Sequence, residues 1–163
     1  RDSSTSRGLG DVYKRQEITE KNMRDVLEVR KALEELAVQL ACDKITKEEI
    51  EEMKKAAEDF KKILKSKDIT EIAEADVRFH DIIYMATDNQ KLIQLLNNLR
   101  EQMYRYRVEY LKREEAHPQL IAEHAAIIEY ISKGEKKAAT DIMCKHIDNQ
   151  VTTVIDVIRT KQN

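Results

Sequence analysis

Residues 68–83 read DITEIAEADVRFHDII, a stretch that contains neither glycine nor proline. Its apolar side chains recur at every third or fourth position, which is the period of one face of an α-helix. Asp68 is a residue type that caps helix N-termini, and Glu71 follows three positions later. The pattern predicts a helix over about 69–87, and the apolar face of this helix also carries Asp76 and His80.

The composition extends the helical prediction to the whole chain. The 163 residues include three glycines and one proline, whereas average usage would supply roughly twenty such residues. This count excludes sandwiches, barrels and α/β folds, whose turns need these residues. A charged fraction of 37% beside 41% hydrophobic residues fits amphipathic helices with solvated outer faces. We therefore predict an all-α fold, an antiparallel bundle of about six helices.

Local signals place the six helices. Thr46 and Glu49 have the spacing of a capping box, Asn89 is an N-cap signal, and Gly134 suits a helix C-terminus. The predicted helices cover about 21–43, 46–67, 69–87, 89–113, 117–134 and 135–160. The apolar stripe of the first helix consists of Val26, Val29, Leu33, Leu36 and Leu40.

Residues 1–16 differ from the rest of the chain. They read RDSSTSRGLGDVYKRQ, contain two of the three glycines and have no hydrophobic period. This segment resembles translated sequencing-adapter sequence and is predicted to be a non-native or disordered leader, with a genuine disordered linker as the alternative. The predicted domain is residues 17–163, which we expect to be a piece of a longer protein because no initiator Met precedes it.

The sequence excludes several classes of protein. It has no apolar run near the ~20 residues that cross a bilayer, and its first residues lack the apolar core of a signal peptide. Cys42 and Cys144 are too few for a disulfide scaffold and are not spaced as a zinc knuckle. A net charge of −2 argues against nucleic-acid binding by this chain alone. A cytoplasmic protein is expected.

Polar side chains within the apolar faces indicate a site. Asp76 and His80 are four residues apart on one helix, and His124 and His146 interrupt the apolar faces of two others. A single buried histidine is more often a hydrogen-bonded core residue, but burying four such groups costs several kcal/mol each (order of magnitude) unless they are paired or bound. The sequence therefore predicts a central metal and ligand pocket in the bundle.

The set of three imidazoles and one carboxylate suits a divalent transition metal such as zinc, nickel, manganese or iron. The chain has no His-Glu-x-x-His motif, phosphate-binding loop or nucleophile elbow, so no catalytic residue is predicted. Two alternatives stay open at this stage. One is a helical-bundle metalloenzyme in which Glu123 acts as a base, and the other is a metal-free helical interaction domain.

The order of these motifs resembles a known family. The resemblance rests on residues 28–34, 76–80, 86–89, 123–124, 127–128, 134–135 and 138–139, and on His146. Residues 17–163 resemble the FCD domain, the C-terminal effector domain of FadR-type regulators in the bacterial GntR family, and are most similar to its VanR-like six-helix branch. The resemblance implies Asp76, His80, His124 and His146 as metal ligands and a small organic acid as effector.

Four residues are candidate ligand contacts. Arg30 matches the family's first-helix arginine, and a guanidinium suits a carboxylate; the alternative is a salt bridge to Glu34 or Glu28. Arg105 and Tyr106 are candidates for lining the pocket, with packing or an interface as the alternative. Asn149 follows His146 by three residues and is a candidate contact or a solvated helix position.

The resulting prediction is a ligand-sensing domain of a transcription regulator, not an enzyme and not membrane-bound. It binds a divalent metal and a small carboxylate and forms a homodimer, with the first and fourth helices as the expected dimer surface. DNA is contacted only through an N-terminal winged-helix domain that this chain lacks.

Overall fold

The computed structural model describes residues 18–163, and the predicted leader 1–16 lies outside them. The described residues form seven α-helices and two 3-10 turns, and they contain no strand. These are α2 (Glu20–Lys44), α3 (Lys47–Ile63), η1 (Leu64–Ser66), α4 (Ile69–Ala86), α5 (Gln90–Asn98), α6 (Arg100–Leu111), η2 (Glu114–Ala116), α7 (His117–Ser132) and α8 (Lys136–Gln162). The prediction of an all-α fold is confirmed.

The helix termini follow the predicted capping residues. Thr46 forms a complete capping box with Glu49. The Asp68 carboxylate accepts hydrogen bonds from the first-turn amides of α4, and the Asn89 side chain accepts from the amide of Leu92 in α5. After α7, Gly134 has φ 70°, a left-handed conformation that glycine adopts without steric cost.

The predicted helix over 89–113 is two helices in the structure. α5 and α6 meet at Leu99, whose backbone has φ −97° and ψ −2°. The prediction of one continuous helix was wrong because the leucine period runs through the break, from Leu92 to Met103, and no glycine or proline marks it.

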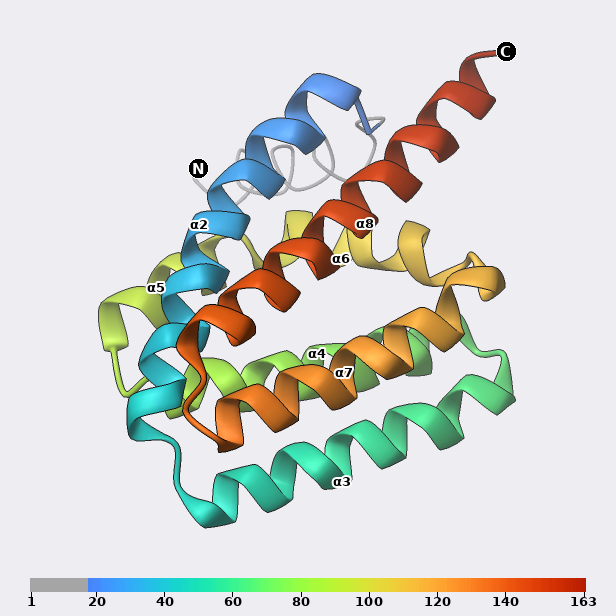
Figure 1. The fold of residues 1–163 in the computed structure, drawn as a ribbon. Coiled ribbons are helices and arrows are strands. Elements are labelled where there is room, and N and C mark those ends of the chain that lie inside the picture. The colour runs from blue at the N-terminus through green and yellow to red at the C-terminus, as the bar shows by residue number, and fades with distance from the viewer. Residues whose placement is uncertain (1–17) are drawn as a thin grey trace, which may run out of the picture.

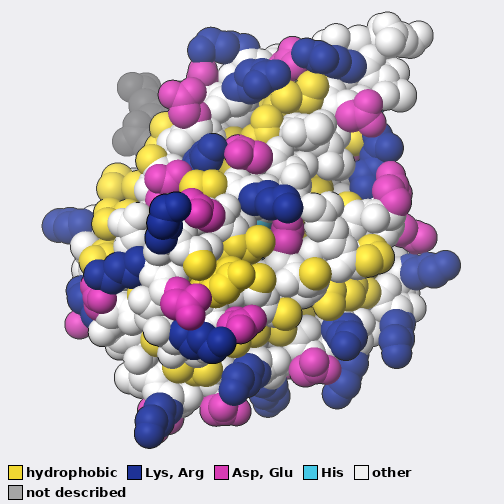
Figure 2. Space-filling view, viewed as in Figure 1, with side chains coloured by type: hydrophobic (Ala, Val, Ile, Leu, Met, Phe, Trp, Pro, Cys, Tyr) yellow, Lys and Arg dark blue, Asp and Glu magenta, His cyan; other side chains and the backbone are white. Residues whose placement is uncertain are grey.

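Long antiparallel helices build the bundle. In Figure 1, α2 and α8 run side by side, and α3 lies along α4 and α7. α8 packs on both α2 and α7, while α6 contacts α4 and α8. Figure 2 shows acidic and basic side chains interleaved with hydrophobic ones over this face of the molecule. None of the described helices combines the length and apolarity needed to cross a membrane.

The first helix faces the core with an unexpected set of residues. Its predicted apolar stripe is only partly buried, and Val29 and Leu36 are 52% and 42% exposed. The buried face of α2 instead carries Met23, Leu27, Arg30, Glu34, Ala37, Val38 and Ala41. An acid and a base thus replace apolar side chains in the middle of the core face.

Most of the buried polar residues gather where two apolar clusters meet, since the His124 ring packs on Phe79 of one cluster and on Phe60 of the other. The Phe79 cluster also includes Val38, Ile127 and Met143, and the Phe60 cluster also includes Leu27, Ile72, Leu120 and Val154. At the boundary between the two clusters, α2, α4, α7 and α8 contribute buried polar side chains. This polar layer consists of Arg30, Glu34, Asp76, His80, His124, His146 and Gln150.

Candidate metal site

Helix α4 supplies the first two predicted ligands. Asp76 and His80 are both buried, and they lie one turn apart on the core face of the helix. The Nε2 atom of His80 is 3.8 Å from Oδ2 of Asp76. The i, i+4 spacing in the sequence therefore brings these two side chains together, as predicted from helical geometry.

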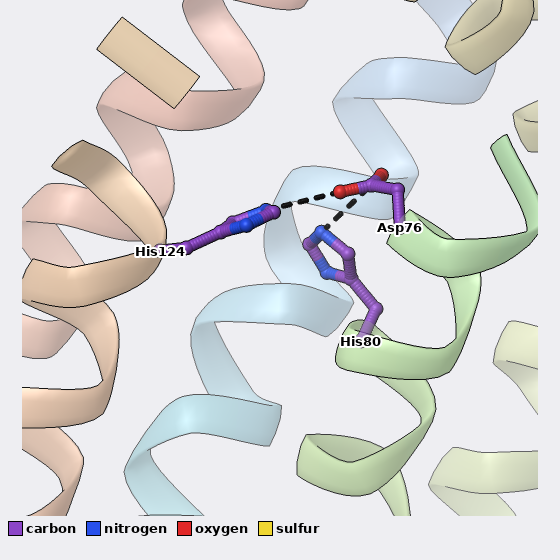
Figure 3. Close-up of side chains that lie close together, drawn as sticks. All are labelled: Asp76, His80 and His124. Carbon is purple, nitrogen blue, oxygen red and sulfur yellow. Dashed lines mark hydrogen bonds and ion pairs between the residues drawn. The ribbon is translucent and has the colours of Figure 1, made fainter. Parts of the chain in front are cut away.

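Helix α7 adds His124 from the opposite side. Its Nε2 atom is 3.0 Å from Oδ1 of Asp76, and Figure 3 shows the three side chains converging from α4 and α7. One ligand atom from each of Asp76, His80 and His124 lies within 4.8 Å of the other two. This spacing is compact enough for one cation to contact all three residues.

The fourth predicted ligand, His146 on α8, lies beside this group. Its ring stacks on that of His80, with centroids 5.3 Å apart and an interplanar angle of 25°, and its centroid is 6.0 Å from that of His124. The Nδ1 atom of His146 is 3.0 Å from Oε1 of Glu123. The structure thus places all four predicted residues next to one another, with Asp76, His80 and His124 as the tightest group.

Unpartnered nitrogen atoms support a cation in this place. Among the described residues, both ring nitrogens of His80 and Nδ1 of His124 are buried without a hydrogen-bond partner. Each such atom costs about 1–3 kcal/mol when it is left unsatisfied. The His124 ring itself is held by Phe79, whose ring stacks on it at 4.2 Å, and by the edge of Phe60 at 4.9 Å. The residues present fit a metal ion with nitrogen and oxygen ligands.

The protonation states also suit a metal. Burial lowers the pKa of His80 to about 4 and also lowers the pKa of His124. Burial would raise the pKa of Asp76, but the neighbouring His80, His124 and Arg107 outweigh it and hold this pKa well below its usual range. Neutral imidazoles and an ionised carboxylate are the forms that bind metals.

Comparison with known proteins places the chain in a family. The model of the FCD domain matches residues 25–149. The chain belongs to the FCD domain family. It is therefore a regulatory domain and not an enzyme. This confirms the predicted family and the prediction that the domain is not an enzyme.

A relative of this FCD domain is the uncharacterized HTH-type transcriptional regulator YdhC of Bacillus subtilis (strain 168). The two are 26% identical over 133 residues, which are 81% of this chain and 59% of YdhC. The chain thus spans about three fifths of the length of this relative.

Arg107 is a member of the site that the sequence did not single out. It lies on α6 and is buried, and its Nε donates a hydrogen bond of 2.6 Å to Oδ2 of Asp76. In the sequence it stands in the Tyr-Arg-Tyr-Arg run of residues 104–107, where nothing distinguishes it from Arg105. Together with His124, it occupies both oxygens of the Asp76 carboxylate in this FCD domain.

Glu34 is the second addition, and it explains the position of Arg30. Nε of Arg30 is 3.6 Å from Oε1 of Glu34, so the alternative of a salt bridge is confirmed. The Arg30 guanidinium also donates to Gln150, and the Tyr84 hydroxyl donates to Glu34. Burial would raise the pKa of Glu34, but His80, whose Nδ1 lies 3.6 Å away, and Arg30 outweigh it and hold this pKa at about 2.

Two of the other candidate ligand contacts hydrogen-bond to residues other than Asp76. Nδ2 of Asn149 donates to Oε2 of Glu123 at 2.8 Å. The Tyr106 hydroxyl accepts from Asn22 at 3.1 Å, and Arg105 lines grooves at the surface of α6. Ligand binding by Arg30, Arg105, Tyr106 and Asn149 stays a prediction.

Proposed function

We propose that this FCD domain is the effector-binding domain of a GntR-type bacterial transcription regulator. It binds a divalent transition metal through Asp76, His80, His124 and His146, and a small carboxylate beside the metal. The supporting observation is the buried Asp/His group with unpartnered ring nitrogens at the boundary between two apolar clusters. When bound, the metal supplies a Lewis acid that holds an anionic oxygen of the effector.

The regulatory role rests on a difference in affinity between two states. An effector shifts a conformational equilibrium only by binding one arrangement of the protein better than the other. The name of the relative YdhC, an HTH-type regulator, supports an additional DNA-binding domain in the whole protein. Effector binding at the polar layer, which joins four helices, would then change how such a domain contacts DNA.

Metal removal tests this function. We expect the purified chain to carry about one transition-metal ion, found by mass spectrometry, and to lose it to a chelator. At a metal concentration 1,000 times Kd, binding contributes about 4 kcal/mol, so the melting temperature should fall by roughly 8–16 °C on removal and return on reloading. A chain with no stoichiometric metal and an unchanged melting temperature would support the metal-free interaction domain instead.

The effector carboxylate has two candidate donors on one face of α6. Besides Arg107, the Tyr110 hydroxyl is buried without a hydrogen-bond partner among the described residues. Burial and the charges of Glu123 and Asp76 raise the pKa of Tyr110, so its hydroxyl keeps its proton. Arg107 and His80 also line a cavity of only about 10 Å³. This is the size of one water molecule, so an acid entering here must widen it.

Tyr110→Phe tests this donor. Losing one hydrogen bond is worth about 0.5–1.5 kcal/mol, so we expect carboxylate affinity to fall roughly 2–10-fold with metal content unchanged. Calorimetry on the zinc-loaded chain, with acetate and citrate as probes, measures the carboxylate affinity. Tyr104→Phe, in a groove at the protein surface, is the matched control. Equal affinities in the two variants would exclude Tyr110 as a contact.

A homodimer is also part of the proposal. Val29 and Leu36 lie two turns apart on α2, and Leu95 on the neighbouring α5 is 51% exposed. These helices correspond to the first helix and the first part of the fourth in the sequence prediction. Large apolar side chains exposed on two adjacent helices support a protein contact there.

A further inference from the structure

Glu123 is a buried acid whose role is not explained by the metal ligands alone. It lies on α7 directly before His124 and is 3% exposed. Both of its carboxylate oxygens have partners on α8, because Oε1 lies 3.0 Å from Nδ1 of His146 and Oε2 accepts from Nδ2 of Asn149 at 2.8 Å. Both contacts join α7 to α8, so the carboxylate connects two of the helices that carry the proposed ligands.

The contact with His146 determines where the ring carries its proton. A carboxylate is an acceptor only, so a hydrogen bond between Oε1 and Nδ1 requires a hydrogen on Nδ1. The neutral ring then has its free lone pair on Nε2. Because the His146 ring stacks on His80 inside the polar layer, Nε2 is the atom left to bind a metal there.

Asn149 fixes the carboxylate itself. It follows His146 by three residues on α8, so both side chains lie on the same side of that helix. With its second oxygen held by the Asn149 amide, the Glu123 carboxylate is kept in the orientation that meets Nδ1. A carboxylate behind a metal-bound imidazole typically fixes the tautomer and makes the ring a better ligand.

We propose that Glu123 is a positioning residue that holds His146 in the Nδ1–H tautomer and so makes Nε2 its metal-binding atom, with Asn149 holding Glu123 in place. This inference rests on the proposed metal site. It also gives Asn149 a different role from the effector contact expected from its place in the sequence.

Two readouts test the proposal. In the metal-free chain labelled with ¹⁵N-histidine, the NMR shifts of His146 should report the Nδ1–H tautomer, and Glu123→Ala should shift it toward Nε2–H. Zinc affinity, measured by titration against a competing chelator, should fall about 10–100-fold in Glu123→Ala. Glu123→Gln should restore most of the zinc affinity, because its amide oxygen still accepts from Nδ1–H and its NH2 group can donate to the Asn149 amide oxygen once that side chain turns over. The matched control is Glu129→Ala, an exposed acid on the same helix paired with Lys133, which should change neither readout.

Further variants separate positioning from folding and from the metal site. In a His146→Ala background, Glu123→Ala should cost no further zinc affinity. Asn149→Ala should also lower the zinc affinity, but by a smaller factor than Glu123→Ala. An Nε2–H tautomer of His146 in the parent chain would overturn the proposal. A zinc affinity of Glu123→Ala within twofold of that of Glu129→Ala would also overturn it. If the parent chain binds no zinc, the proposed function fails, and the tautomer in the metal-free chain still decides the role of Glu123.

Discussion

His124→Ala is expected to remove most of the metal from the purified chain. The imidazole is the only contribution of α7 to the tightest group, and its Nε2 lies 3.0 Å from Asp76. Loss of an outer-shell partner typically lowers metal affinity 10–100-fold, so loss of a ligand should lower it by more than about 100-fold. Metal content by mass spectrometry and zinc affinity by competition with a chelator measure the effect.

His117→Ala is the matched control for this experiment. His117 begins the same helix, and its Nε2 lies 2.7 Å from the carbonyl oxygen of Leu111, away from the polar layer. We expect this variant to keep the metal content of the parent chain. Circular dichroism of both variants checks that the bundle is folded. Equal metal content in the two folded variants would contradict the assignment of His124 as a ligand.

The sequence predicts those candidate site residues that interrupt the most regular apolar helix faces. Asp76 and His80 stand in a long, regular apolar face with a clear N-cap, so the direction of their side chains follows from the i, i+4 rule alone. His124 and His146 likewise interrupt faces rich in isoleucine. Four polar residues at such positions are enough to predict that their side chains meet in the core, because few other arrangements satisfy them.

Other parts were missed because charged residues occupy core positions. On α2 the leucines and valines define a stripe that stays partly exposed, while Arg30 and Glu34 face inward. A hydrophobic period cannot identify a buried ion pair. The polar atoms of this pair are satisfied partly by Gln150 and Tyr84, which lie far from it in the sequence. Arg107 was missed for the same reason: it follows Met103 by four residues on the buried face of α6, but a charged residue at this position does not signal a core contact.

Arg30→Ala should cause the largest loss of stability among single changes on α2. The Arg30–Glu34 pair is buried, with side-chain exposures of 1% and 0%, and Glu34 stays ionised because its pKa is about 2. Removing one partner of a buried pair leaves an uncompensated charge and typically costs about 3–5 kcal/mol. The Gln150 amide oxygen also loses the hydrogen bond from Arg30.

The control for this change lies on the same helix. Lys21 and Asp25 have the same i, i+4 spacing but are exposed, with Nζ 2.7 Å from Oδ1, so Lys21→Ala should leave the free energy of unfolding almost unchanged. Urea unfolding of the metal-free chain measures both variants without a contribution from the metal. A loss below about 1 kcal/mol in Arg30→Ala would mean that Glu34 is not left as an uncompensated charge. Restoration of stability in Arg30→Met with Glu34→Leu would show that the cost comes from the unpaired charge, because apolar side chains of similar volume can replace a buried ion pair.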